Sequence, residues 1–180
     1  MLQVEVDRLL EAARWKNQPI EVDTQEIDLE AWLTRSLFRW RLVFGPKIQL
    51  NRSGGELDRN WSGDPRLLDL ILDNLMDNAR KFTDHAGPEL ATVTVHTLSD
   101  GAGWRIEVKD NGRGFSEKDS RRIFRRFVRG KQGLSRRTVP GTGLGLFLAA
   151  SAASAMGLTI KGESSGFNQG ACFVVEGPHV

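Results

Sequence analysis

The segment from residue 104 to residue 109 alternates strictly between apolar and charged side chains. Its apolar members are Trp104, Ile106 and Val108, and its charged members are Arg105, Glu107 and Lys109. Because successive side chains of a β-strand point to opposite faces, the pattern predicts a strand with one face in a core and one in water. A sheet of such strands can carry helices on one face only, which restricts the chain to two layers.

Four segments have the pattern of helices. They are Leu2 to about Trp15, Leu29 to about Phe44, Pro65 to about Phe82 and about Gly143 to Met156. Asp28 is a favourable N-cap for the second helix, Gly45-Pro46 ends it, and Pro65 suits the first position of the third. The third helix has the clearest apolar face, made by Leu68, Ile71, Leu72, Leu75 and Ala79.

Seven short runs have the pattern of strands. They are Ile20–Val22, Ile48–Asn51, Leu57–Trp61, Ala91–Leu98, Trp104–Lys109, Leu158–Lys161 and Ala171–Val175. The glycine-containing segment Ser99 to Gly103 predicts a hairpin, and turns at Ser53-Gly54-Gly55 and Ser164 to Gly170 separate other strands. With 180 residues, this mixture predicts one α+β domain, a two-layer sandwich with a mixed, mostly antiparallel sheet.

Composition excludes several classes of protein. A single cysteine, Cys172, forms no internal disulfide, and the three histidines show no zinc-ligand spacing. A formal net charge of +2 is too close to neutrality for a nucleic-acid-binding arm. However, nine basic residues and one acidic residue lie between Lys118 and Arg137, which favours a nearby anion. The uncharged segment Pro140–Ile160 is rich in Gly, Ala and Ser and therefore too weakly hydrophobic for a membrane span.

Three segments carry residue types suited to a phosphate or a flat ring. Asn74, Asn78 and Lys81 share one polar edge of the third helix, where an amide oxygen suits Mg²⁺ and an ammonium suits phosphate. In Asp110–Phe115 a strand-end carboxylate can accept from an exocyclic amino group. Gly141–Leu146 opens a helix, whose free amides favour phosphate. Taken singly, each is more simply a solvated helix edge or a turn.

Taken in order, these segments resemble the N, G1, F and G2 boxes of sensor histidine kinases. The boxes correspond to Asn74–Phe82, Asp110–Phe115, Ile123–Phe127 and Gly141–Leu146. The resemblance runs from about Ile20 to Gly177 and is to the ATP-binding catalytic domain of the GHKL superfamily. It implies a sandwich of the Bergerat type, with helices on one face of the sheet and a mobile ATP lid at about 128–140. Residues 18–180 would form this domain, and residues 1–17 the tail of an upstream dimerisation helix.

The resemblance also implies site residues, with ATP and Mg²⁺ as cofactors. Asn78 would ligate Mg²⁺, and Lys81 and Arg129 would contact phosphate, so these three are implied in catalysis. Asn74 would support the phosphate end, and Asp110 would accept from the adenine amino group. The implied nucleotide-binding residues are Asn74, Asn78, Lys81, Phe82, Asp110, Gly112, Gly114, Phe115, Arg129, Gly141, Thr142, Gly143, Leu144 and Gly145.

The implied activity is transfer of the γ-phosphoryl group of Mg·ATP to a histidine. In the family this histidine lies on a long helix and precedes an acid, a setting that His85, His96 and His179 lack. We therefore expect the acceptor upstream of this chain, which alone would not autophosphorylate. The implied partners are the dimerisation and histidine-phosphotransfer domain of the same protein, a homodimer when intact, and a response regulator receiver domain. Neither nucleic acid nor membrane contact is expected, and the implied location is the cytoplasmic portion of an inner-membrane sensor.

Three alternatives stay open at this stage. A GHKL enzyme that hydrolyses ATP would need a glutamate base four residues before Asn78, but Asn74 stands there and a carboxamide cannot take that proton. A nucleotide-sensing module without catalysis and a nucleic-acid binder are the others. The sequence also departs from the family at Arg125 or Arg126, one of which stands where many members have an acid, and at Phe82, where tyrosine is commoner.

Overall fold

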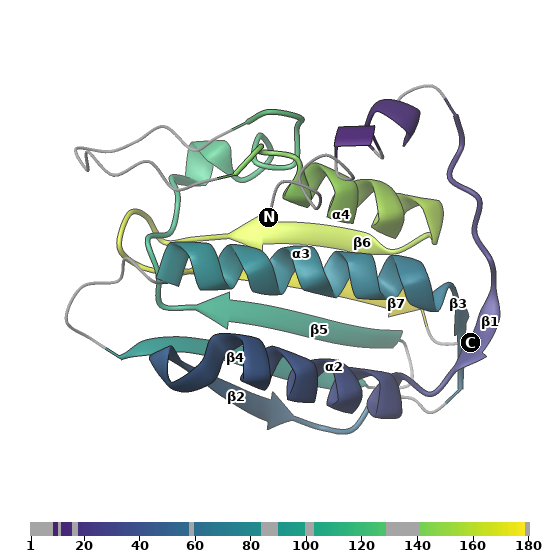
Figure 1. Cartoon of the computed structure of the whole chain (residues 1–180), viewed down its shortest axis with the longest axis horizontal. Coiled ribbons are helices and arrows are strands. Elements are labelled where there is room, and N and C mark those ends of the chain that lie inside the picture. The colour runs from purple at the N-terminus through teal and green to yellow at the C-terminus, as the bar shows by residue number, and fades with distance from the viewer. Residues whose placement is uncertain are drawn as a thin grey trace.

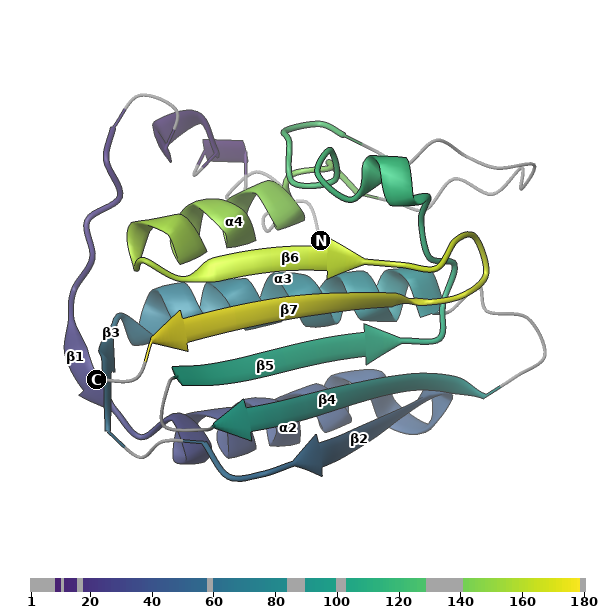
Figure 2. The same ribbon diagram turned by 180° about the vertical axis from the view of Figure 1, so that it is seen from behind.

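The computed structural model describes residues 9–10, 12–15, 18–57, 60–83, 90–99, 103–128 and 141–178. Helices α2 (Leu29–Phe44), α3 (Pro65–Thr83) and α4 (Gly145–Ala155) lie on one face of a five-stranded sheet (Figure 1). In the reverse view no helix of the described residues covers the other face (Figure 2). The predicted α+β two-layer sandwich is therefore confirmed.

The sheet is mixed and mostly antiparallel, as expected. Its strands are β2 (Ile48–Gly54), β4 (Ala91–Ser99), β5 (Gly103–Asp110), β6 (Thr159–Glu163) and β7 (Ala171–Pro178). They lie in the order β2-β4-β5-β7-β6, in which β2 is parallel to β4 and the other neighbours are antiparallel. In this order β5 is the central strand, and Asp110 is its last residue.

Two predicted strands are displaced. The first strand is β1 (Gln25–Ile27) rather than Ile20–Val22, and the third is β3 (Trp61–Gly63) rather than Leu57–Trp61. The two pair with each other as a separate antiparallel ribbon. The backbone N–H of Leu57 donates instead to Glu30 Oε2 at 3.0 Å, so this residue is not in a strand ladder.

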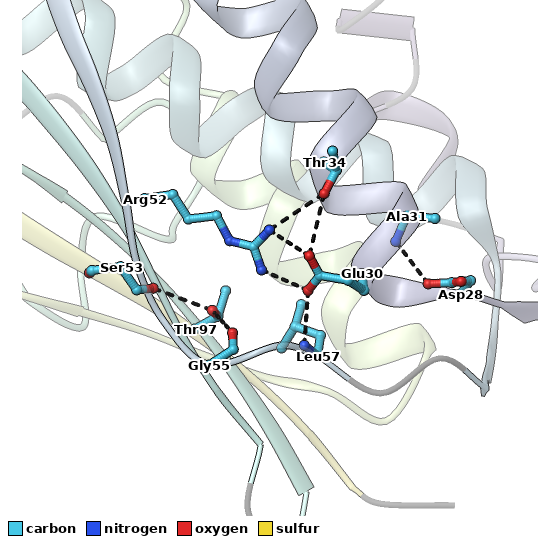
Figure 3. A network of polar contacts seen from close by, with 9 residues as sticks. All are labelled: Asp28, Glu30, Ala31, Thr34, Arg52, Ser53, Gly55, Leu57 and Thr97. Carbon is cyan, nitrogen blue, oxygen red and sulfur yellow. Dashed lines mark hydrogen bonds and ion pairs between the residues drawn. The ribbon is translucent and has the colours of Figure 1, made fainter.

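The glycine turn after β2 does not lead into a hairpin with the next strand. Gly54 has a φ of +92°, and a Cβ there would overlap the carbonyl oxygen of Thr97 on β4. The Thr97 hydroxyl in turn donates to the Gly55 carbonyl oxygen at 2.5 Å (Figure 3). The turn is thus bound to the end of β4, and β2 pairs with β4 instead.

The core lies between the helices and the inner face of the sheet. Every residue of the predicted apolar face of α3 is buried, and so are Trp104, Ile106 and Val108 of β5. The alternate residues Arg105, Glu107 and Lys109 stay accessible on the open face, which confirms the alternation. Each large side chain buried in this way contributes about 1.5–3 kcal/mol, so the amphipathic patterns account for the layering.

Helix α2 is held at the β2 edge by a half-buried ion pair. Both terminal nitrogens of Arg52 donate to the Glu30 carboxylate, at 2.6 and 2.7 Å (Figure 3). The bond to Arg52 outweighs the effect of burial and holds the pKa of Glu30 at about 2. Asp28 accepts from the Ala31 N–H at 2.8 Å and caps the helix as predicted.

The described part of the N-terminal helix, residues 9–10 and 12–15, lies against α4. Ala12 is buried with Leu144 and Leu148 in a small apolar cluster. None of the helices among the described residues has the length and hydropathy to cross a bilayer.

Candidate functional site

The polar edge of α3 lies in the second half of that helix. Asn78 is half-buried, and its side chain makes no hydrogen bond with the residues that the structure describes. Lys81 Nζ lies 2.6 Å from Asp77 Oδ2, and Arg80 pairs with the same carboxylate at 2.8 Å. Asn78 thus presents an unused carboxamide, whereas Lys81 shares its charge with a carboxylate.

Asn74 begins this edge but is 2% exposed. Its Nδ2 donates to the Leu70 carbonyl oxygen at 2.8 Å, while its Oδ1 is buried with no hydrogen-bond partner among the described residues. The oxygen faces α4, because a Cβ built on Gly145 would lie 2.8 Å from it. Asn74 therefore lies in the seam between α3 and α4 rather than on the open surface.

Asp110 closes β5 with a buried carboxylate. The residue is 4% exposed, and its Oδ1 accepts the Gly112 N–H at 2.9 Å. Burial raises the pKa of Asp110 to about 6, against the backbone hydrogen bonds from Gly112 and Ala171 that lower it. A carboxylate held in this way can accept a hydrogen bond from a ligand in a site largely closed to water.

The loop after Asp110 is fixed on both sides. On one side it meets the end of α3, where Arg113 N–H donates to the Phe82 carbonyl oxygen at 3.2 Å. Gly112 has no room for a Cβ, which would lie 2.6 Å from that oxygen and 2.8 Å from Asp110 Oδ1. On the other side Gly114 lies against the 164–170 turn. Phe115 is buried there, with its ring centroid 6.1 Å from that of Phe173.

The glycine segment 141–145 lies beside the polar edge of α3. A Cβ on Gly141 would be 3.8 Å from Lys81 Nζ, and Thr142 next to it is half-buried. Leu144 is fully buried and precedes α4, whose first turn has no side-chain cap. The amides at the start of α4 are therefore available to an anion.

The segment Ile123–Phe127 connects the sheet edge to this glycine segment. Ile123 is buried, and Phe124 packs edge-to-face on Phe173 with ring centroids 6.4 Å apart. Phe127 N–H donates to the Gly143 carbonyl oxygen at 3.1 Å, and the Phe127 side chain is 65% exposed. The backbone here fixes one end of the glycine segment. Arg129 and residues 130–140 lie outside the described residues.

The three predicted constellations thus meet around the second half of α3. Phe82 accepts a hydrogen bond from the loop after Asp110, while Asn74 and Lys81 lie next to the 141–145 segment. A buried acceptor, a glycine-lined approach and open helix amides fit an adenine nucleotide. The described residues hold no group of three or more His, Cys, Asp or Glu side chains suited to a metal. Among the described residues, the half-buried Asn78 offers a carboxamide oxygen that suits Mg²⁺, an ion that keeps several waters and also binds substrate phosphates.

Sequence reasoning missed several residues that build the site. Ser164 Oγ accepts the Phe115 N–H at 3.1 Å and donates to the Gly170 carbonyl oxygen at 2.7 Å. Gly170 N–H donates to the Gly112 carbonyl oxygen at 3.0 Å. Asp77, which holds Lys81, could have been found from its i, i+4 spacing to that lysine. The turn from Ser164 to Gly170 was predicted, but its bonds to Phe115 and Gly112 leave no local signal, because those two residues lie far away in the sequence.

Residues 63–179 match the family described as histidine kinase-, DNA gyrase B- and HSP90-like ATPases. The sensor protein RstB of Escherichia coli (strain K12) is 31% identical over 165 residues, which are 91% of this chain and 36% of RstB. The sensor protein TorS of the same strain is 35% identical over 118 residues, 64% of this chain and 12% of TorS. The chain therefore spans well under half the length of these curated relatives.

Solved structures agree with this match. Full-length ShkA in complex with AMPPNP has a TM-score of 0.77 and 27% identity, covering 98% of this chain and 35% of that chain. The mycobacterial sensor histidine kinase MprB has a TM-score of 0.68 and 22% identity. The match covers 86% of this chain and 96% of the MprB chain, and it shows that the two share a fold. Since the family match extends over more than half of the residues, the chain belongs to the histidine kinase-, DNA gyrase B- and HSP90-like ATPase family.

Proposed function

We propose that this chain is the ATP-binding catalytic domain of a two-component sensor histidine kinase. It binds Mg·ATP and presents the γ-phosphoryl group to a histidine on a dimerisation domain outside residues 1–180. The observation that carries the proposal is the buried carboxylate of Asp110. It lies beside the point where Gly112, in the loop after Asp110, packs against the backbone of Phe82. The sensor names of the relatives support the same role.

Asp110 is the residue that selects the base. Above a pH of about 6 its carboxylate is ionised and accepts a hydrogen bond from the amino group of adenine. Guanine presents a carbonyl oxygen at the corresponding ring position, which the carboxylate would repel. Phe82, Gly112 and Gly114 form the walls on either side of the base.

Asn78 and Lys81 act at the phosphate end. Asn78 is the side-chain ligand for Mg²⁺, which supplies charge neutralisation at the phosphates when bound. Lys81 turns from Asp77 toward phosphate, and the backbone N–H groups at the start of α4 donate to the phosphate oxygens. Arg129, from the 128–140 lid, reaches the terminal phosphate.

The reaction is phosphoryl transfer rather than hydrolysis. Transfer of this kind depends on positioning and charge neutralisation, which amides, a lysine and a metal supply. Hydrolysis needs a base for water, and the position that would hold it carries Asn74, whose amide nitrogen already donates to Leu70. The partners we propose are the dimerisation domain of the same protein, in a homodimer, and a receiver domain. The setting is the cytoplasmic portion of an inner-membrane sensor.

Calorimetric titration tests the nucleotide site. We expect Mg·AMPPNP to bind, and the corresponding guanine nucleotide to bind at least about tenfold more weakly, because Asp110 accepts from the amino group of adenine. The Asp110→Asn variant should lose most of this discrimination. Equal affinity for the two nucleotides, or no binding of either, would contradict the proposal.

Phosphorylation assays test the acceptor. Incubated alone with γ-labelled ATP, the chain should stay unlabelled, since His96 lies on strand β4 and the sequence around His85 and His179 lacks the acceptor pattern of the family. Mixed with a dimerisation domain that carries the acceptor histidine, it should label that domain. Acid-labile label on His85, His96 or His179 would show that the acceptor lies within this chain.

A further inference from the structure

The glycines of the segment 141–145 are required for different reasons. Gly141 and Gly143 have φ angles of +151° and +72°, which a side chain would strain. Gly145 has no such angle and is the first residue of α4. Alanine is the better helix former at such a position, so the backbone gives no reason for glycine there.

What excludes a side chain at Gly145 is Asn74. The three atoms nearest to a Cβ built on Gly145 are Oδ1, Cγ and Cβ of Asn74, at 2.8, 3.6 and 3.9 Å. Asn74 has little freedom to move away, because it is 2% exposed and its Nδ2 donates to Leu70. The two residues are therefore matched in size across the seam between α3 and α4.

The carboxamide oxygen of Asn74 is the second feature of this seam. Its Oδ1 is buried without a hydrogen-bond partner among the described residues, which is costly for a carboxamide. It faces the start of a helix whose first turn has no side-chain cap. An acceptor in this place suits the N–H groups of that turn as neighbours, and it has no hydrogen to donate to a phosphate oxygen.

We propose that Asn74 is a positioning residue that sets the place of the start of α4, with Gly145 as its steric partner, and that it does not itself contact phosphate. Its consequence for ligand binding rests on the proposed nucleotide function. A shift of the α4 start moves the segment that carries Gly141, which lies next to Lys81. The base end at Asp110 is held by β5 and β7 and stays in place.

A double-mutant cycle tests the pair. The variants are Asn74→Ala, Gly145→Ala and both together, each measured for thermal unfolding without ligand and for binding of Mg·AMPPNP and adenosine. Each single change should lower Tm by about 4 °C and weaken Mg·AMPPNP about tenfold. Adenosine affinity should change less than about twofold. In the double variant the added methyl group enters the space left by the carboxamide, so at least half of both losses should return.

Gly55→Ala is the matched control, because Gly55 has no positive φ and open space around it. Combined with Asn74→Ala it should give additive effects. Additive losses in the Asn74→Ala/Gly145→Ala variant, or wild-type behaviour of Gly145→Ala, would overturn the proposal. So would a loss of Mg·AMPPNP affinity in Asn74→Ala with unchanged Tm, since that indicates direct contact with phosphate.

A substitute variant and a readout that needs no ligand keep the experiment decisive. Asn74→Ser, which also removes the carboxamide, replaces Asn74→Ala if the latter does not fold. If the wild-type chain binds neither nucleotide nor adenosine, the proposed function fails, and the Tm cycle still decides whether the Asn74–Gly145 pair exists.

Discussion

Asp110 shows what the surroundings of a single residue do to its chemistry. Its position at the end of a strand would ordinarily leave a carboxylate in water. The neighbouring strand β7 and the Gly112 loop instead bury it to 4% exposure, and the pKa rises from 3.8 to about 6. The folded state therefore holds a proton that the unfolded state has lost between these two pH values. The stability contributed by this site falls as pH rises from about 4 to 6.

We predict opposite effects of Asp110→Asn on stability and on binding. At pH 8 the variant should unfold with a free energy higher by about 1–3 kcal/mol, because a buried charge is removed, and at pH 4 the difference should be small. Urea unfolding at the two pH values measures this. ADP affinity should fall by 1–3 kcal/mol, or about 5- to 150-fold, because the amide can present its donor to the adenine amino group. Unchanged ADP affinity would remove Asp110 from the base site.

At the scale of elements, the start of α3 depends on one buried acid. Asp64 is fully buried, and its carboxylate accepts the N–H groups of Asp23 and Arg66 at 2.9 Å and pairs with the Arg66 side chain. Burial alone would raise the pKa of Asp64, but the bonds from Arg66 and from the backbone outweigh it and lower the pKa to about 2. The acid thus ties the first turn of α3 to the segment before β1.

We predict that Asp64→Asn destabilises the fold by about 2 kcal/mol at pH 7, measured by urea unfolding. The lowered pKa means that the stabilisation is complete above about pH 4 and is lost as pH falls from about 4 to 2. Wild type and variant should therefore converge near pH 2. Asp28→Asn, at the more exposed cap of α2, should cost less, since asparagine is an equally good N-cap. A difference for Asp64→Asn that persists at pH 2 would refute the charge-based account.

At the scale of the whole molecule, the positive charge is concentrated in one segment of the chain. Residues 118–137 hold nine basic residues and one acidic residue, a net charge of +8, whereas the rest of the chain sums to −6. Positive charge gathered there favours a polyanion over a monoanion, because each added phosphate charge meets the same field. The terminal phosphate of ATP is the group that such a segment would distinguish.

We predict that hydrogen exchange in residues 129–140 slows more with Mg·AMPPNP than with Mg·ADP. The expected cause is a contact from Arg129 to the terminal phosphate. Arg129→Ala should remove the difference while ADP affinity changes less than about twofold, because the base site is untouched. Arg137→Ala, the same charge change in the same segment, should preserve the difference. Equal protection by both nucleotides in the wild-type chain would contradict the assignment.

Local signals in the sequence determined the main helices of this protein, its central hairpin and the positions of its motifs. The bounds of α2 and α3 follow from Asp28, Gly45-Pro46 and Pro65, and the hairpin of β4 and β5 from its glycine turn. Each depends on residues within a few positions, so backbone preference and side-chain periodicity suffice. The motif residues of the site could be predicted for the same reason, since each constellation occupies one short segment.

Contacts between distant segments could not be predicted from the sequence and are seen only in the tertiary structure. The pairing of β2 with β4, and of β1 with β3, joins strands more than 30 residues apart and displaced two predicted strands. The burial of Asp110 and the seam that closes Asn74 against Gly145 arise in the same way. A strand edge or a polar side chain is compatible with many partners, and the partner is chosen by how the whole core closes.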